Sequence, residues 1–600
     1  MNTTSGAIDA HWGAGQVYDF YKSLGRDGLD GKGGSMTSVV DVVYGGKAYD
    51  NAFWDGTKMV YGRASNGRSF ASDLDVVGHE MTHGVTQHTA GLLYVNQSGA
   101  INEAMSDYLG NAIDVTASGT AMSDPDAGLL GEDLCPDKVP RDCALRDMND
   151  GRRADRDFVS APIDVDSGGV HLNSTIFSGA LWDVREHIDP ALADRIAYTA
   201  LTQYFTPFTD FYSGRLAVLD AARALGADGK QLRAVRKAFD AHGIVKGWEK
   251  RQPHDADVLL DDILPASAPD VSGNHWVAST ENWYSGAPEI HVGYVNDKGG
   301  DRSRVISEPA TGSATENGVI GNTAPRISGG TVVWTRLTRV NPYWVNADVV
   351  KAKFDGTGPV TDLEPGGGMQ GSPDIDGDTI VWTGDVPDGG TYDHSDLFMK
   401  KGDQDWVNLT PDSKVEAHAP RVSDGLIAFV HADRNNGYRL DVGAYRPATG
   451  ELTVLKAGTG PDGDAQYPTA VDTNGHDVVW AESLYDYPTQ LHAASADGSH
   501  DRVLVPAGTA RTPYSPSITV NADYLVYSDY RGYYTDDYTQ ERAFPNLWMM
   551  PLSGSPATPV SCDAGGQEAP VLGTGRRVLW IDSTFGNTGL VTREARRTHC

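Results

Sequence analysis

Apolar residues follow two different spacings along the chain, one up to about residue 248 and another after residue 268. The segments "DAHWGAGQVYDFYKSLG" and "SGRLAVLDAARALGADGKQLRAVRKAFDAHG" place apolar residues three and four positions apart, with Gly near their ends. This spacing predicts amphipathic helices. Residues 249–268 form a polar, proline-bearing stretch, and helical spacing is absent beyond it. We therefore predict a helix-rich, mostly α or α+β domain over residues 1–248, a linker over 249–268 and an all-β domain over 269–600.

The second half contains a repeat of about 48 residues. Each unit begins with a proline entry and continues with a Gly/Asp/Asn turn and a β-branched and aromatic run, which predicts a hairpin with a buried second strand. One or two further strands follow in most units, which is typical of a β-propeller blade. The seven units begin at Pro269, Pro325, Pro373, Pro420, Pro468, Pro516 and Pro570. We predict a seven-bladed β-propeller, with a β-solenoid or a pair of sandwiches as the alternative. The units weakly resemble the propellers found beside dipeptidyl and prolyl peptidases.

The last unit is one strand short of the others. The linker segment "DADVLLDDI", residues 255–263, has the composition of the missing strand. We expect it to close the last blade, with a link between Cys562 and Cys600 holding the tail.

The charge of the chain indicates which binding partners are disfavoured, and its cysteine content indicates the compartment in which it works. Lys and Arg number 49 against 81 Asp and Glu, a formal net charge of −32, which disfavours nucleic acid and anionic membrane surfaces. No apolar run approaches a membrane span, and the N-terminus lacks the pattern of an export signal.

The four cysteines pair most simply as Cys135–Cys143 and Cys562–Cys600, one of three possible pairings, although free thiols are the alternative. An even count favours an oxidising, extracellular compartment. We expect a monomer.

Candidate metal ligands occur in residues 75–107, "DVVGHEMTHGVTQHTAGLLYVNQSGAINEAMSD". His79 and His83 are four residues apart, so on a helix they point the same way and can bind one ion. Glu80 would lie beside that ion without binding it, where a base for a bound water belongs. Glu103 supplies a third ligand, and Asp107 can orient a ligand histidine. Two His and one Glu leave one zinc position open, which is the arrangement of a catalytic site.

These residues resemble the thermolysin family of neutral zinc metalloproteases. The resemblance runs from about Ala7 to Val245 and includes "NAFWDGTKMVYG", "LRDMND", "DSGGVHLNS" and "YFTPFTDF". It implies peptide-bond hydrolysis with one catalytic zinc, Glu80 as general base, and Tyr94 and His171 as donors to the oxyanion, with Asp166 orienting His171. The expected partners are therefore proteins and peptides.

The resemblance also implies where a peptide would bind. Asn51 and the backbone of Ala52 would pair with an extended substrate, and Arg146 would hold a substrate carbonyl unless it forms a surface ion pair instead. The leaving-group pocket would be lined by Val76, Leu130, Leu134 and Leu145. Because these side chains are apolar, we expect cleavage on the amino side of bulky hydrophobic residues.

Calcium is the second metal that the resemblance implies. Asp75, Asp114 and Glu132 match family ligands, but Leu129 occupies an acidic ligand position. We expect one calcium ion, with Asp124 or Asp126 standing in for the missing ligand, or else an acidic surface without an ion.

Two departures leave a second reading open. The sequence begins where the family's catalytic domain is already some sixty residues along, so part of its N-terminal β-rich lobe is expected to be missing, and no pro-segment precedes it. The alternative is therefore an inert or unstable protease remnant whose propeller binds protein or polysaccharide. A serine peptidase is disfavoured because the sequence contains no GxSxG.

Overall fold

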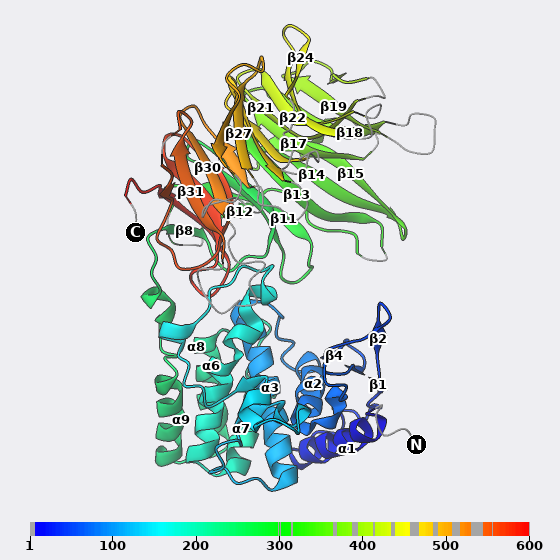
Figure 1. The fold of residues 1–600 in the computed structure, drawn as a ribbon, viewed down its shortest axis with the longest axis vertical. Coiled ribbons are helices and arrows are strands. Elements are labelled where there is room, and N and C mark those ends of the chain that lie inside the picture. Colours follow the sequence, from blue (N-terminus) through cyan, green and yellow to red (C-terminus); the bar gives the residue numbers. More distant parts are fainter. Residues whose placement is uncertain are drawn as a thin grey trace. The chain divides into compact units, whose positions relative to one another are not determined.

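The computed structural model describes residues 6–598 and 600 apart from internal gaps. The gaps are 298, 300–301, 314–315, 364–368, 387–393, 412–414, 434–438, 456–466, 484–489, 507–516, 530–543 and 555. The chain divides into two compact units, Met1–Gln252 and Pro253–Cys600. Figure 1 shows the helices in the first and the sheets in the second. No helix in the described part of the chain is long and apolar enough to cross a membrane.

The first unit is mainly helical. Its helices are α1 (Ala7–Ser23), α2 (Leu74–Gln87), α3 (Asn96–Ser118), α4 (Pro140–Cys143), α5 (Ala154–Asp157), α6 (Asp166–His187), α7 (Pro190–Gln203), α8 (Phe211–Ala224) and α9 (Gly229–Ala241). Its short strands are β1 (Ser38–Val40), β2 (Val43–Tyr44), β3 (Lys47–Ala48), β4 (Ala52–Trp54), β5 (Met59–Tyr61), β6 (Leu129–Leu130) and β7 (Arg146–Asp147). The sheet order β1-β5-β4 leaves β4 at an edge. Helices α2, α3 and α6 pack together around one core that excludes water from the unit's centre.

Two glycines let α2 and α3 approach closely. A Cβ on Gly78 of α2 would lie 2.8 Å from the Cα of Gly110 of α3, and one on Gly110 would lie 2.6 Å from the backbone N of His79. Any larger residue at either position would push the helices apart. The close packing brings the polar residues of α3 beside those of α2.

The second unit consists of four-stranded antiparallel sheets, seven of them in the described residues. They are β9 (Pro265–Ser272), β10 (His275–Glu281), β11 (Pro288–Tyr294), β12 (Arg304–Val305); β13 (Gly318–Ser328), β14 (Thr331–Asn341), β15 (Trp344–Lys353), β16 (Thr361–Asp362); β17 (Gln370–Asp376), β18 (Thr379–Val386), β19 (His394–Lys401), β20 (Val407–Asn408); β21 (Val415–Ser423), β22 (Leu426–Asp433), β23 (Arg439–Arg446), β24 (Glu451–Leu455); β25 (Tyr467–Thr473), β26 (Asp477–Ser483), β27 (Gln490–Ser495), β28 (Arg502–Val505); β29 (Ile518–Val520), β30 (Tyr524–Asp529), β31 (Asn546–Pro551), β32 (Thr558–Pro559); and β33 (Gln567–Leu572), β34 (Arg577–Asp582), β35 (Gly589–Glu594) with β8 (Asp257–Leu260).

The seventh sheet joins the two ends of this unit. β8 pairs antiparallel with β35, through Leu260 opposite Leu590 and Val258 opposite Val591. A disulfide links Cys562 to Cys600, and another links Cys135 to Cys143 in the first unit, so the structure has the simplest of the three pairings. The strands β9, β13, β17, β21, β25, β29 and β33 each lie at one edge of their sheet; they contact one another in this order, and β33 contacts β9 again.

Six of the seven repeat prolines lie inside the first strand of their sheets, so their predicted position as strand entries is wrong. Pro325 lies within β13 and Pro420 within β21. The register shifts at these points, and the preceding Ala324 and Ala419 have φ angles of 51° and 48°. A β-bulge of this kind accommodates a residue that has no N–H to donate. Pro516 lies outside the described residues.

Candidate metal centre and active site

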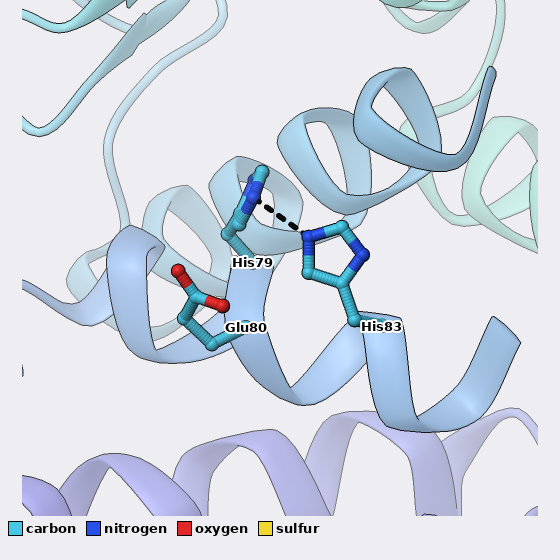
Figure 2. Close-up of side chains that lie close together, drawn as sticks. All are labelled: His79, Glu80 and His83. Carbon is cyan, nitrogen blue, oxygen red and sulfur yellow. Dashed lines mark hydrogen bonds between the residues drawn. The ribbon is translucent and has the colours of Figure 1, made fainter. Parts of the chain in front are cut away.

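The candidate ligands come from α2 and α3. His79 and Glu80 are buried and His83 is half-buried, all on α2, and Glu103 is fully buried on α3. Figure 2 shows His79 and His83 turned toward each other on one side of the helix, with Glu80 beside them. The Nε2 atoms of His79 and His83 are 3.1 Å apart. Oε2 of Glu103 lies 3.4 Å from Nε2 of His79, and Oε1 lies 3.3 Å from Nε2 of His83.

These distances fit a zinc ion. Ligand atoms placed about 2.0–2.1 Å from a tetrahedral zinc lie about 3.3–3.4 Å from one another. The two Nε2 atoms and the Glu103 carboxylate are already arranged in this way, and Oε2 of Glu103 has no hydrogen-bond donor among the described residues although it is buried. Burial and Glu103 act in opposite directions on His83, and the balance raises its pKa to about 9. The site therefore attracts positive charge.

Neighbouring side chains orient both histidines. Oδ1 of Asp107 lies 2.9 Å from Nδ1 of His79, and Oδ1 of Asn102 lies 2.9 Å from Nδ1 of His83. Each contact fixes the ring so that Nε2 faces the centre of the cluster. Sequence reasoning anticipated the position of Asp107 but missed Asn102, although it directly precedes Glu103.

A left-handed turn at the start of α6 presents His171. Four consecutive residues, Asp166 to Gly169, have φ angles of 52°, 51°, 83° and 80°. This turn places Oδ1 of Asp166 2.5 Å from Nδ1 of His171, and Oδ2 accepts from the backbone N–H of His171. Burial opposes protonation of His171, but the hydrogen bond to Asp166 and the negative charges of Glu103 and Asp166 together outweigh it, so the pKa of His171 lies above its usual value.

Tyr94 and His171 lie on the same side of the candidate metal centre. The Tyr94 hydroxyl is 3.2 Å from Nε2 of His171 and donates to Oε1 of Glu103 at 2.5 Å. Two hydrogen-bond donors therefore converge beside the ligand cluster, as an oxyanion requires.

Arg146 forms a buried ion pair. Its Nε and Nη2 donate to Asp107 at 3.0 and 2.6 Å, and Nη2 lies 3.6 Å from Glu103. The Arg146 side chain also lines the cavity. It therefore forms an ion pair, as one expectation had it, but this pair is buried beside the cavity and not at the surface.

A cavity of about 540 Å³ contains the cluster. Apolar side chains line one part of it and the edge strand β4 another. The expected residues in its lining are Asn51, Ala52, Val76, Leu130, Leu145 and Arg146, and those that sequence reasoning missed include Phe53, Trp54, Phe70, Gln87 and Leu92. Leu134 is absent from this lining and packs in the core, with 3% of it exposed.

Two family models cover the unit that holds this site. Residues 1–87 match "Thermolysin metallopeptidase, catalytic domain" and residues 90–244 match "Thermolysin metallopeptidase, alpha-helical domain". Residues 1–87 and 90–244 thus match the thermolysin family. The family uses zinc and binds calcium.

The thermolysin-family unit has curated relatives at moderate identity. It is 40% identical over 256 residues to bacillolysin of Bacillus caldolyticus and to thermolysin of Alicyclobacillus acidocaldarius subsp. acidocaldarius, covering 40% of this chain and 45% of each relative. It is 37% identical over 251 residues to gelatinase of Enterococcus faecalis, covering 40% of this chain and 47% of that protein. The chain spans about half the length of the curated relatives it matches.

Solved structures resemble each unit separately. The precursor of protealysin from Serratia proteamaculans is 29% identical, with 40% of this chain and 79% of that chain covered and a TM-score of 0.35. The β-propeller domain of the trilobed protease from Pyrococcus furiosus is 10% identical, with 56% and 96% covered and a TM-score of 0.38. Because both TM-scores are below 0.5, neither match defines the fold.

The thermolysin-family unit also contains a carboxylate cluster that suits calcium. Asp73 and Asp75, at the start of α2, are buried, and Glu132 and Asp114 lie beside them. Oδ1 of Asp75 and Oε2 of Glu132 are buried without a hydrogen-bond donor in the described part of the chain. Burial and the neighbouring carboxylates raise the pKa of Glu132 to about 8 and that of Asp114 to about 6. Oxygen ligands of this type suit Ca²⁺.

Asp124 and Asp126 do not join this cluster. Asp124 is exposed and Asp126 is half-buried, and the backbone N–H of Asp126 donates to Oδ1 of Asp124, as in a surface turn. The extra carboxylate is Asp73, which sequence reasoning missed. It precedes the helix by one residue, so helical spacing gives no signal that it faces Asp75.

Proposed function

We propose that this chain is a zinc endopeptidase. The observation that carries the proposal is the mutual spacing of 3.1 to 3.4 Å among His79 Nε2, His83 Nε2 and the Glu103 carboxylate, with Glu80 beside them. His79, His83 and Glu103 would hold the zinc. Bound zinc would polarise the scissile carbonyl and make water a stronger nucleophile.

The side chains around the cluster divide the remaining work. Glu80 would take the proton of the attacking water and pass it to the leaving amine. Protonated His171, held by Asp166, and Tyr94 would donate to the oxyanion. The Tyr94 hydroxyl donates to Glu103, and rotation about its C–O bond would direct the same proton to the oxyanion.

The cavity supports a preference for bulky hydrophobic residues after the scissile bond. Val76, Leu130 and Phe70 line it as buried apolar side chains, and Leu145 adds an exposed one. Burying a large apolar side chain against them would contribute about 1.5–3 kcal/mol. β4 is an edge strand, so Asn51 and Ala52 are available to pair with an extended peptide. Arg146 would hold a substrate carbonyl while it remains paired with Asp107.

We propose further that the second unit is a seven-bladed β-propeller that recruits substrates or surfaces. The ring of contacts among the seven edge strands β9, β13, β17, β21, β25, β29 and β33 supports this arrangement. The two disulfides favour an extracellular location.

The test is hydrolysis of an internally quenched peptide with Phe or Leu after the scissile bond. The full chain, loaded with one equivalent of zinc, is compared with Glu80→Gln and with a chelated sample. Loss of cleavage in both supports the proposal. No cleavage by folded, zinc-loaded chain identifies the inert alternative.

A further inference from the structure

The loops at one end of the seven sheets differ from the turns at the other. The turns between first and second strands contain no Phe, Tyr or Trp in any of the seven sheets. By contrast, every described loop between second and third strands contains at least one. These loops are 282–287 ("NWYSGA"), the hairpin tip 340–344 ("VNPYW") and 583–588 ("STFGNT"). The corresponding loops of the other four sheets lie wholly or largely outside the described residues.

Tyr284 and Tyr343 are displayed by similar turns. Oδ1 of Asn282 accepts from the backbone N–H of Tyr284 at 3.0 Å, and Oδ1 of Asn341 accepts from that of Tyr343 at 2.9 Å. Tyr284 is 90% exposed and Tyr343 96%, the two highest values for a large apolar or aromatic side chain in the described part of the chain. Each asparagine fixes the local backbone, so the ring is presented at little conformational cost.

The β14–β15 hairpin extends beyond its own sheet. β13 pairs with β14 no further than Gly318 opposite Arg339, whereas β14 and β15 continue to Asn341 opposite Trp344. Figure 1 shows these two strands side by side. Trp344 next to the tip is 59% exposed and Val340 44%. The hairpin therefore carries the exposed Tyr343 and Trp344 at a tip that projects past its pairing with β13.

The three loops belong to neighbouring sheets. β33 and β34 contact β9, and β10 and β11 contact β13. At this end, Nε1 of Trp283 donates to the carbonyl of Asp262, and the next residue, Ile263, donates to the carbonyl of Thr588. Phe585, Trp283, Tyr284, Tyr343 and Trp344 thus come from three consecutive sheets and share one end.

The composition of the loops indicates the chemistry of a partner. None of their residues is Asp, Glu, Lys, Arg or His, although the chain has a net charge of −32. A polyanion would be repelled by that charge. The basic side chains that contact the loops already have partners there: Arg339 donates to the carbonyl of Pro342, and the His254 ring packs against Phe585. Protein interfaces are enriched in Arg, which the loops also lack. Flat Tyr and Trp rings pack against the C–H faces of sugar rings, while Asn, Ser and Thr can bond to hydroxyl groups.

We propose that this end of the second unit, centred on Tyr284, Tyr343 and Trp344, binds a neutral polysaccharide. The aromatic rings stack on successive or alternate sugar units, and loop amide and hydroxyl groups contact the sugar hydroxyls. This binding is independent of the zinc site and of peptide hydrolysis.

Native affinity electrophoresis of the full chain tests the proposal. The gels contain laminarin, hydroxyethyl cellulose, arabinoxylan, galactomannan or soluble starch, and mobility is compared with a gel without polymer. We expect at least one of these neutral polymers to retard the chain. Tyr343→Ala/Trp344→Ala should weaken that retardation at least fivefold, measured as the polymer concentration that halves the mobility, and Tyr284→Ala should weaken it further.

The matched control is Tyr294→Ala/Trp406→Ala, which removes half-exposed aromatic residues at the opposite end of the sheets (42% and 39% exposed). It should bind as the unmodified chain does. Thermal unfolding checks that all variants are folded. Retardation by none of the polymers, equal loss in the control, or variant-sensitive binding of a protein instead would overturn the proposal.

Discussion

The backbone N–H of Trp54 donates a hydrogen bond of 3.1 Å to Oε2 of Glu80. This bond connects the edge strand β4 to the carboxylate that we propose as the general base. The Trp54 indole is held as well, because its Nε1 donates to Oε1 of Gln87 at 2.6 Å. These two hydrogen bonds therefore fix the position of β4, which would receive the substrate, relative to Glu80, which would activate water.

Gln87→Met should weaken this connection without touching a ligand. The substitution keeps the length of the side chain but removes the acceptor of Trp54 and the donor to the Gly56 carbonyl. A hydrogen bond of this kind contributes about 0.5–1.5 kcal/mol, so we expect kcat/KM for a quenched peptide to fall about 2- to 12-fold. Zinc content should not change. Unchanged kcat/KM in a folded variant would show that Trp54 needs no support from Gln87.

Asp107→Ala should lower zinc affinity about 10- to 100-fold, the usual cost of removing the partner of a ligand histidine. Competition with a chromophoric chelator measures this. Because Asp107 also pairs with Arg146, the control is Ser174→Ala, which removes another donor to Asp107 and leaves both contacts intact. Equal zinc affinity in Asp107→Ala and the unmodified chain would contradict the orienting role of Asp107.

Gly168→Ala should disturb both stability and activity. At φ 83° a side chain is strained by about 1–2 kcal/mol, and its Cβ would also lie 2.1 Å from Oδ1 of Asn96. Gly226→Ala is the matched control, since Gly226 has φ 79° but nothing within 4 Å of the added Cβ. We expect the thermal midpoint to fall further in Gly168→Ala, and kcat to fall only there, because the turn positions His171. Similar effects of both substitutions would mean that the turn needs no close packing.

Calcium should stabilise the first unit through Asp75 and Glu132. Addition of a calcium-selective chelator should lower its thermal midpoint, and Asp75→Asn should abolish that dependence. Asp73→Asn should weaken it, while Asp124→Asn/Asp126→Asn should leave it unchanged, because those two carboxylates lie on a separate surface turn. Thermal unfolding of the unmodified chain and the three variants at a series of calcium concentrations measures this dependence. Loss of calcium dependence in the Asp124/Asp126 variant would restore the prediction from sequence.

Asp563 should make the second unit less stable as pH rises. Burial, with Asp582 and Asp255 nearby, raises the pKa of Asp563 to about 8, whereas an unfolded Asp has a pKa of about 3.9. Between these values the folded chain holds a proton that the unfolded chain has lost. The stabilisation is therefore fully present below about pH 4 and is lost as pH rises through 8.

Asp563→Asn should remove this pH dependence. The difference in thermal midpoint between the variant and the unmodified chain should grow from pH 5 to pH 9, in favour of the variant. Arg593 and Arg596 pair with Asp255 rather than with Asp563, so they do not offset the effect. Asp403→Asn, on an exposed turn, serves as the control. A constant difference across this pH range would contradict the raised pKa.

The sequence predicted the parts of the structure that depend on local periodicity. Four-residue spacing placed His79 and His83 together because a helix requires it, and the repeat gave seven hairpins because each combines a turn with a β-branched run. Residues 255–263 were recognisable because the last unit lacked a strand, and β8 occupies that place.

Other features depend on tertiary packing and could not be read in this way. Leu134 has the polarity of a pocket residue, but only the fold decides that it faces the core. Asp73 reaches Asp75 from a non-helical position, and the interior prolines are tolerated through bulges that no local pattern reveals. Gln87 and Trp54 meet across 33 residues of sequence.

The most direct test of the central claim is the rate of quenched-peptide hydrolysis by the zinc-loaded full chain beside Glu80→Gln, with zinc content measured in both. Glu80 binds no metal in our account, so the variant should keep one zinc ion while its kcat falls about 10²- to 10⁴-fold. Cleavage by the variant at the rate of the unmodified chain would contradict the role of Glu80. The claim of a zinc endopeptidase would be contradicted if neither protein cleaved the peptide while both were folded and held zinc.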